Sequence, residues 1–212
     1  SESGLSAGLW GIPYIALPTP GPRPIAVNSA FLSVLTRDGG VQTAGVQPAQ
    51  GGAMTITRPL LGRVAGVGGI GALTDGTDVA VGSAHLCAVV DGGAIRCWGE
   101  NYAGQLGDYS ATGRPMPVAV RGPGGAGYMT GAGRVSLGSA HSCAIQEPGT
   151  LYCWGSNEYG KLGDGTTTTR YVPTPVALAD GGGAIIDAID VAPGDHHTCA
   201  IRDGGSVWCW GW

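Results

Sequence analysis

Six cysteines and three histidines recur at a fixed spacing and are the residues of this chain best suited to chemistry. The cysteines form three pairs, the partners of each pair lie ten positions apart, and a histidine stands two residues before each pair. Two arrangements fit: a disulfide within each pair, or a metal site made of one imidazole and two thiolates. Zinc prefers four ligands in a closed structural site, and no fourth ligand recurs nearby, so the spacing favours disulfides over metal. The sets are His85 with Cys87 and Cys97, His141 with Cys143 and Cys153, and His197 with Cys199 and Cys209.

These residues belong to a repeat that runs through the chain. Near-identical stretches begin at Val79, Val135 and Val191, and successive starts are 56 residues apart. A weaker copy precedes them, in which Phe31 stands at the histidine position and Ser33 and Thr43 stand at the cysteine positions. A fixed period of this size is typical of a solenoid or propeller built from one supersecondary unit per repeat.

Inside a repeat, the residues between the two cysteines predict a β-hairpin. Glycines at Asp91-Gly92-Gly93 supply the positive φ that a three-residue hairpin loop needs. Centring the loop on Gly92 places Cys87 opposite Cys97, Ala88 opposite Arg96 and Val89 opposite Ile95. Cysteines directly opposite each other in an antiparallel pair have Cα atoms about 4.5 Å apart, at the short end of disulfide geometry. Three disulfides within hairpins would indicate an oxidising compartment.

The pairing of small with large residues across the hairpin predicts a sheet that is buried on both faces. Segments 117–120, 175–178 and 185–191 read as further strands, which gives about four short strands per repeat, the size of one propeller blade. No window shows helical periodicity, so we expect an all-β fold: a β-propeller of four-stranded blades with about four repeat units in a single domain. The expected repeat cores span residues 26–45, 79–108, 135–164 and 191–212 of the domain 1–212.

The last repeat stops at Trp210-Gly211-Trp212, before its outer strands. An unfinished blade has an open sheet edge, and open edges recruit strands. We therefore expect residues 1–25 to act as a closing segment. The strand that completes the blade of Cys199 and Cys209 is expected between about Leu9 and Val27. The strand would come from the same chain, which closes a ring, or from a neighbour, which builds an assembly. The residues expected at this assembly seam are Leu9, Trp10, Ile12, Tyr14, Trp208 and Trp212.

After each complete hairpin follows the pattern Trp-Gly-x-Asn-x-x-Gly-x-Leu-Gly, from Trp98 to Gly107 and from Trp154 to Gly163. Together with His-x-Cys-Ala, this pattern resembles the repeat of the regulator-of-chromosome-condensation family of β-propellers. The resemblance implies a propeller fold with Trp98, Trp154 and Trp210 in the core between blades, and Asn101 and Asn157 in the following turn. The cysteine pairs resemble secreted bacterial members, which implies a secreted or cell-surface location, in a bacterium.

The recurring histidines have two interpretations. Their rings could converge on the propeller axis as a ligand or metal site, or each could link one blade to the next. A buried imidazole needs partners for its ring nitrogens, and repetition in every blade fits a structural link better than a single active site.

Composition argues against two classes of function, nucleic-acid binding and membrane insertion. With 11 basic and 15 acidic residues and a net charge of −4, the chain has no basic patch for nucleic acid, and no apolar run is long enough for membrane insertion. No catalytic pattern stands in a suitable context, and no cofactor is expected. We expect a secreted, non-enzymatic propeller that binds proteins or assembles with itself through strand donation. The alternatives are a regulatory chromatin- or GTPase-binding propeller like the family namesake, or the scaffold of a larger enzyme.

Overall fold

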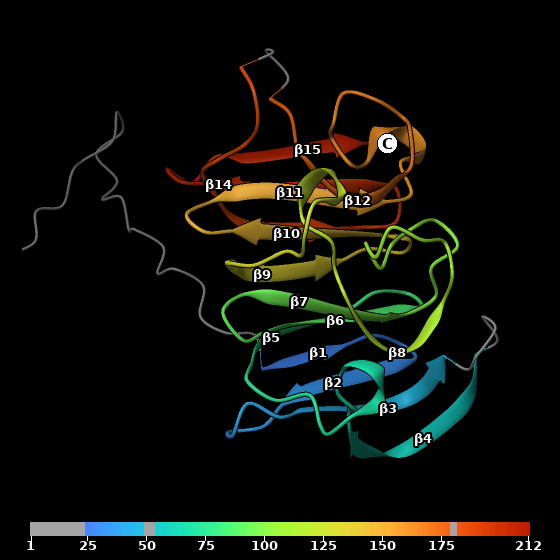
Figure 1. Cartoon of the computed structure of the whole chain (residues 1–212). Helices are drawn as coiled ribbons and strands as arrows, with labels where there is room; N and C mark the ends of the chain where they lie inside the picture. The colour runs from blue at the N-terminus through green and yellow to red at the C-terminus, as the bar shows by residue number, and fades with distance from the viewer. Residues whose placement is uncertain (1–23, 49–53, 179–181) are drawn as a thin grey trace, which may run out of the picture.

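A computed structural model describes residues 24–48, 54–178 and 182–212 of the chain. These residues form four antiparallel sheets, which we call blades I to IV, and each sheet runs in chain order from one edge to the other (Figure 1). The helical segments of the described residues are single 3₁₀ turns: η1 (Val67–Gly69), η2 (Pro123–Gly125) and η3 (Glu158–Gly160). None of them could cross a membrane. The all-β prediction is therefore confirmed.

Blades I to III have four strands each, whereas blade IV has three among the described residues. Blade I contains β1 (Ile25–Val27), β2 (Phe31–Leu35), β3 (Val41–Pro48) and β4 (Met54–Arg63). Blade II contains β5 (Gly76–Val81), β6 (His85–Val90), β7 (Ala94–Gly99) and β8 (Arg114–Ala119). Blade III contains β9 (Ala132–Leu137), β10 (His141–Gln146), β11 (Thr150–Gly155) and β12 (Arg170–Pro175). Blade IV contains β13 (Ala188–Pro193), β14 (His197–Arg202) and β15 (Val207–Gly211).

The central hairpins have the predicted register. In blade II, Cys87 pairs with Cys97 and Val89 with Ile95, around the loop at 91–93. The equivalent pairs form in blades III and IV, and Ser33 pairs with Thr43 in the copy without cysteines. The outer strands β8 and β12 begin earlier than the predicted 117–120 and 175–178, and the chain leaves the sheet before Val120 and Val176, which turn inward and are buried.

Each blade has two different faces. We call the face that carries the cysteines the disulfide face, and the opposite face, with the recurring tryptophan, the tryptophan face. The disulfide face of blade II packs on the tryptophan face of blade III, where Cys87 and Cys97 share a buried cluster with Ala144 and Trp154. Blade I packs on blade II, and blade III on blade IV, through the same two faces in the same order. The four blades therefore form a stack with one direction, from blade I at the bottom of Figure 1 to blade IV at the top.

The end of the expected closing segment lies elsewhere than predicted. Strand β1 pairs with β2 inside blade I, with Ile25 opposite Val34, and does not join blade IV. The physical reason is local: the Asn28 side chain accepts hydrogen bonds from the amides of Ala30 and Phe31 and so holds a tight turn between the two strands. Closing so short a loop costs less entropy than a long-range pairing. Residues 1–23, with the rest of the expected closing segment, lie outside the described residues.

Candidate functional site

A hydrogen-bonded node of buried side chains joins blades II and III. The Ser142 hydroxyl of β10 donates to the backbone carbonyl of Gln105 at 2.7 Å and lies 2.9 Å from Nε2 of His85. A hydroxyl has one proton to donate, so the histidine Nε2–H must be the donor to Ser142. The Trp154 indole Nε1–H donates to the same Gln105 carbonyl at 3.0 Å. Two side chains of blade III thus form hydrogen bonds with one ring and one carbonyl of blade II.

The same node recurs between blades III and IV, one repeat later. His141 Nε2 lies 2.9 Å from the Thr198 hydroxyl, which donates to the Lys161 carbonyl at 2.8 Å. Trp210 Nε1 donates to that carbonyl at 3.0 Å. Lys161 is itself almost fully buried, and its ammonium donates to the Asp195 carbonyl of blade IV at 3.2 Å. Burial lowers the pKa of this lysine, and the negative charges of nearby Glu158 and Asp195 partly offset that decrease.

Burial keeps both bridging histidines neutral. Desolvation lowers the pKa of His85 to about 3, and desolvation with the charge of Lys161 lowers the pKa of His141 to about 3. The ring edges also pack against backbone: a Cβ added at Gly82 would lie 2.7 Å from His85 Nδ1 and 2.6 Å from the Gly138 carbonyl. The rings therefore serve as hydrogen-bond donors between blades, and no group of three potential metal ligands gathers anywhere in the described part of the chain.

Blades I and II meet without this node. Phe31 takes the histidine position and Leu86 takes the hydroxyl position, so an apolar pair replaces a polar one, and both residues lie in one buried cluster. The indole Nε1 of Trp98 is buried without a hydrogen-bond partner there. At these interfaces a histidine therefore contacts a hydroxyl residue of the next blade, whereas the phenylalanine shares an apolar cluster with a leucine.

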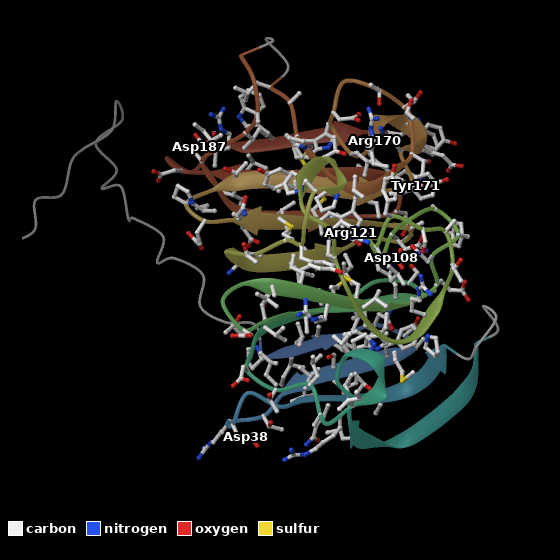
Figure 2. The ribbon with its side chains drawn as sticks, in the orientation of Figure 1. Asp38, Asp108, Arg121, Arg170, Tyr171 and Asp187 are labelled. Atoms are coloured by element: carbon white, nitrogen blue, oxygen red, sulfur yellow. A yellow bond between two sulfur atoms is a disulfide. The ribbon has the colours of Figure 1, made fainter. Side chains whose placement is uncertain are left out.

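A polar loop after each complete hairpin supplies the carbonyl that the node uses. In blade II, Asn101 accepts a hydrogen bond from the amide of Leu106 at 2.9 Å and donates to Asp108 at 3.1 Å. Asp108 also pairs with Arg114 at the start of β8. The loop of blade III repeats these contacts with Asn157, Leu162, Asp164 and Arg170. Asp108 and Arg170 lie on the side of the stack that carries these loops (Figure 2).

All six cysteines form the three predicted disulfides, with Cα atoms 4.1 Å apart in each. The bonds of blades II and III are fully buried because the next blade covers them. In blade IV, Cys209 is exposed and Cys199 is half-buried, because no further blade of the described chain packs on that face. With the sulfurs paired, no thiolate remains for the alternative metal site.

The third strand of blade IV borders a groove. In blades II and III the outer strand pairs with the third strand, but the equivalent strand is absent from blade IV among the described residues. A groove of about 380 Å³ lies along β15 there and is mostly apolar. Its lining includes Gly163, Leu178, Ile185, Trp208 and Trp210.

The structure describes two of the six predicted seam residues, and each has a different ring contact. Trp208 is half-buried beside the groove, with the Arg202 guanidinium 4.9 Å from its ring centre. Trp212 is largely exposed and stacks on Tyr159 with ring centres 5.3 Å apart. Leu9, Trp10, Ile12 and Tyr14 lie outside the described residues.

Sequence reasoning missed the hydroxyls of Ser142 and Thr198. A signal was present in the repeat itself, because the variable residue of His-x-Cys-Ala is Leu86, Ser142 or Thr198, and only the last two follow a blade that has histidine. The residues that match each other lie about one period apart, so the pattern becomes visible only when each copy is compared with the copy before it.

Comparisons with known proteins agree with this architecture. Two sequence profiles of the "Regulator of chromosome condensation (RCC1) repeat" match, one at residues 148–201 and one at residues 77–105 and 134–161. The ultraviolet-B receptor UVR8 of Arabidopsis thaliana is 33% identical over 134 residues, which are 63% of this chain and 29% of that protein. The human E3 ubiquitin-protein ligase HERC2 is 33% identical over 129 residues, 60% of this chain and 3% of that protein.

Solved structures show the same fold. Prp20p from Saccharomyces cerevisiae superposes with a TM-score of 0.69 at 18% identity, covering 88% of this chain and 42% of that one. Human WBSCR16 superposes with a TM-score of 0.69 at 22% identity, covering 89% of this chain and 46% of that one. The chain thus spans less than half the length of these propellers. With the matched repeats, the paired cysteines and the interblade nodes taken together, this chain has a β-propeller fold and contains repeats that are similar to the RCC1 repeat.

Proposed function

We propose that this chain is a secreted, non-enzymatic module that binds proteins, and that the open edge of blade IV is where it accepts a strand. One observation carries the proposal: blade IV is a three-stranded sheet among the described residues, with a groove along β15, whereas the other three blades have four strands. A free strand edge presents unpaired backbone amides and carbonyls that pair readily with an added strand.

The outer strand of blade III illustrates what fills this place in a complete blade. Strand β12 pairs with β11, and the backbone carbonyl of its residue Tyr171 accepts a hydrogen bond from the Tyr109 amide of the previous blade at 3.1 Å. The Tyr171 ring covers Gly104, where an added Cβ would lie 2.6 Å from the tyrosine Cδ1 atom. A strand laid on β15 would cover the equivalent loop at Gly160 in the same way.

The N-terminal segment is the occupant that the sequence offers. Trp10, Ile12 and Tyr14 alternate with smaller residues, the pattern of a strand with one apolar face. Pro13 is compatible with an edge strand, since an edge strand pairs on one side only. Donation within the chain would finish the blade, and donation to a neighbour would build an oligomer or fibre.

The disulfides support the proposed location. Three disulfides within one domain form and persist in oxidising environments, which supports secretion or display at the cell surface. The relatives named above are eukaryotic, so the bacterial source rests on the resemblance of the cysteine pairs alone.

The alternative regulatory function gains no support from the site. Yeast Prp20p is known for its binding to Gsp1p and histones, but an identity of 18% supports the fold alone. A net charge of −4 also disfavours direct binding to nucleic acid. HERC2 is a ligase, but this chain matches 3% of its length, so we propose no ligase activity.

Deletion of residues 1–20 tests the proposal. If these residues fill the β15 edge, the truncated chain will unfold at a lower urea concentration and light scattering will report a changed assembly state. A synthetic peptide of residues 1–20 should restore both properties. The matched control is the same peptide with Ile12→Asp and Tyr14→Asp, which should restore neither. Unchanged stability and assembly after deletion would refute strand completion by this segment.

A further inference from the structure

Exposed tyrosines gather on the loops and outer strands of blades II and III. Among the described residues five tyrosines are exposed, with exposed fractions from 41% to 71%. They are Tyr102, Tyr109, Tyr128, Tyr159 and Tyr171. Both faces of blades II and III are covered within the chain, so the exposure of these rings does not depend on where the described chain begins or ends.

Contacts between the loops of the two blades bring three of these tyrosines together. The Tyr109 amide donates to the Tyr171 carbonyl at 3.1 Å. The Tyr171 ring lies over Gly104, which is two residues after Tyr102 in the same loop. Figure 2 shows Tyr171 on the side of the stack that carries these loops. We call Tyr102, Tyr109 and Tyr171, together with Glu100 and Glu158, the tyrosine surface.

Two carboxylates lie close to the Tyr102 ring, one from each blade. Burial raises the pKa of Tyr102, and the negative charges of Glu158 and Glu100 raise it further. Neither glutamate forms a salt bridge within the described residues, whereas the aspartates of the same two loops each pair with an arginine. Glu158 also acts on the buried Lys161 ammonium, but that group donates its hydrogen bond to the Asp195 carbonyl. The tyrosine surface therefore carries negative charge that no cation of the chain pairs with directly.

Tyr109 is held in a backbone conformation that favours glycine. Its φ is 68°, and the equivalent residue of blade III is Gly165 with a φ of 76°. Glycine adopts this left-handed conformation freely, whereas a tyrosine there costs free energy. The Tyr109 ring lies beside Gly125 of η2 and is nevertheless 71% exposed. An exposed ring at such a position contributes little to folding, which indicates a role in recognition.

We propose that the tyrosine surface binds an extended basic segment of a partner protein, with an arginine or lysine side chain held between the Tyr102 ring and the carboxylates of Glu100 and Glu158. A guanidinium or ammonium group is attracted both by the face of an aromatic ring and by carboxylates. The same carboxylates repel phosphate, which disfavours nucleic acid and anionic membranes. Tyr109 and Tyr171 contact neighbouring residues of the segment, as tyrosines commonly do in protein interfaces.

This inference rests on the protein-binding function proposed above, but it concerns a surface distinct from the β15 edge. It names the chemistry of a partner that strand completion does not specify. Deletion of residues 1–20 leaves the tyrosine surface unchanged, so the two proposals can fail separately.

Fluorescence anisotropy with the whole chain tests the tyrosine surface. The probe is a short fluorescent peptide of alternating arginine and serine, and its matched control has citrulline in place of every arginine, which removes the charge and keeps the shape. We expect saturable binding of the arginine peptide, weaker binding at high salt, and little binding of the citrulline peptide. Tyr102→Ser and Glu158→Gln should each weaken binding at least about threefold.

Two matched variants of the chain separate recognition from general effects. Tyr102→Phe keeps the ring and should bind as the original chain does. Glu147→Gln removes the same charge from the hairpin turn of blade III, at the opposite end of the blade, and should leave binding unchanged. Because Glu158 also acts on Lys161, urea unfolding of each variant checks the fold, and Glu100→Gln repeats the test without that contact.

Four results would overturn the proposal. They are the absence of saturable binding, equal binding of the citrulline peptide, unchanged binding by folded Tyr102→Ser and Glu100→Gln variants, and an equal loss in Glu147→Gln. Displacement of the arginine peptide by a neutral oligosaccharide such as cellohexaose would also contradict it, because the rings would then recognise a glycan.

Discussion

At the scale of single residues, the contacts that His85 and His141 make require a neutral imidazole. Each ring is buried and donates Nε2–H to a hydroxyl of the next blade, and the hydroxyl donates its own proton to a loop carbonyl. A protonated ring would place a charge in a site that burial has emptied of water, which is why the pKa of both falls to about 3.

These pKa values predict a loss of stability in mild acid. Because the folded-state pKa is depressed, the stabilising contribution is complete above the unfolded pKa of about 6.5 and is lost as the pH falls toward about 3. At pH 5 each histidine should cost about 2 kcal/mol of unfolding free energy relative to pH 7. Urea unfolding at the two pH values measures this loss.

The double variant His85→Gln and His141→Gln provides the comparison, because a glutamine amide can still donate but does not titrate. It should start less stable at pH 7 and lose much less between pH 7 and pH 5. His197→Gln is the matched control, since its exposed ring has no hydroxyl partner among the described residues, and it should keep the pH dependence of the original chain. An unchanged slope in the double variant would show that other groups govern the acid response.

At the scale of elements, the loops that follow each hairpin link local structure to blade packing. Asn101 and Asn157 hold their loops by accepting from the amides of Leu106 and Leu162 and by donating to Asp108 and Asp164. The pKa of Asp164 is lowered, because hydrogen bonds from Thr166, Arg170 and Asn157 together outweigh burial, the largest single effect, which acts in the opposite direction. Each loop then presents one carbonyl, of Gln105 or Lys161, to the next blade.

Replacement of Asn157 by alanine should therefore act beyond its own loop. It leaves the buried Leu162 amide without an acceptor. The loop then no longer holds the Lys161 carbonyl in place to accept hydrogen bonds from Thr198 and Trp210. We expect a loss of about 3 kcal/mol in unfolding free energy, together with a shift of the Trp210 fluorescence to longer wavelength. Gln146→Ala is the control, because it removes one exposed hydrogen bond to Thr130, and equal losses in the two variants would contradict this role.

The elements also show what the sequence could predict. The loop Asp91-Gly92-Gly93 determined the hairpin register to the residue, because a three-residue turn fixes which residues face each other. The partner of β1 was predicted wrongly, since three residues carry too little alternation to choose between a near and a distant strand. The Ser142 and Thr198 contacts were not predicted at all, because they depend on how two separate blades align.

At the scale of the whole molecule, the stack has a direction and two unlike ends. Blades II and III have both faces covered, blade I exposes Ile25 and Val27 on its tryptophan face, and blade IV exposes its disulfide face and the β15 edge. In repeat arrays each unit is stabilised by its neighbours, so end units lack part of that stabilisation.

Hydrogen exchange should therefore differ along the stack. We expect the amides of β14 and β15 to exchange at least about tenfold faster than those of β6, β7, β10 and β11, because covering one Val207-sized side chain is worth about 1.5 to 3 kcal/mol and a difference of about 1.4 kcal/mol is tenfold.

Strands β2 and β3 separate the two causes, since blade I also has an uncovered face but keeps its fourth strand. If β2 and β3 are as slow as β6 and β7 while β15 is fast, the open edge governs the opening; if all are fast, the uncovered face does. Equal protection of blades II, III and IV in dilute solution would contradict the open end and would require that blade IV is covered there, and protection of β15 that rises with concentration would identify the cover as another chain.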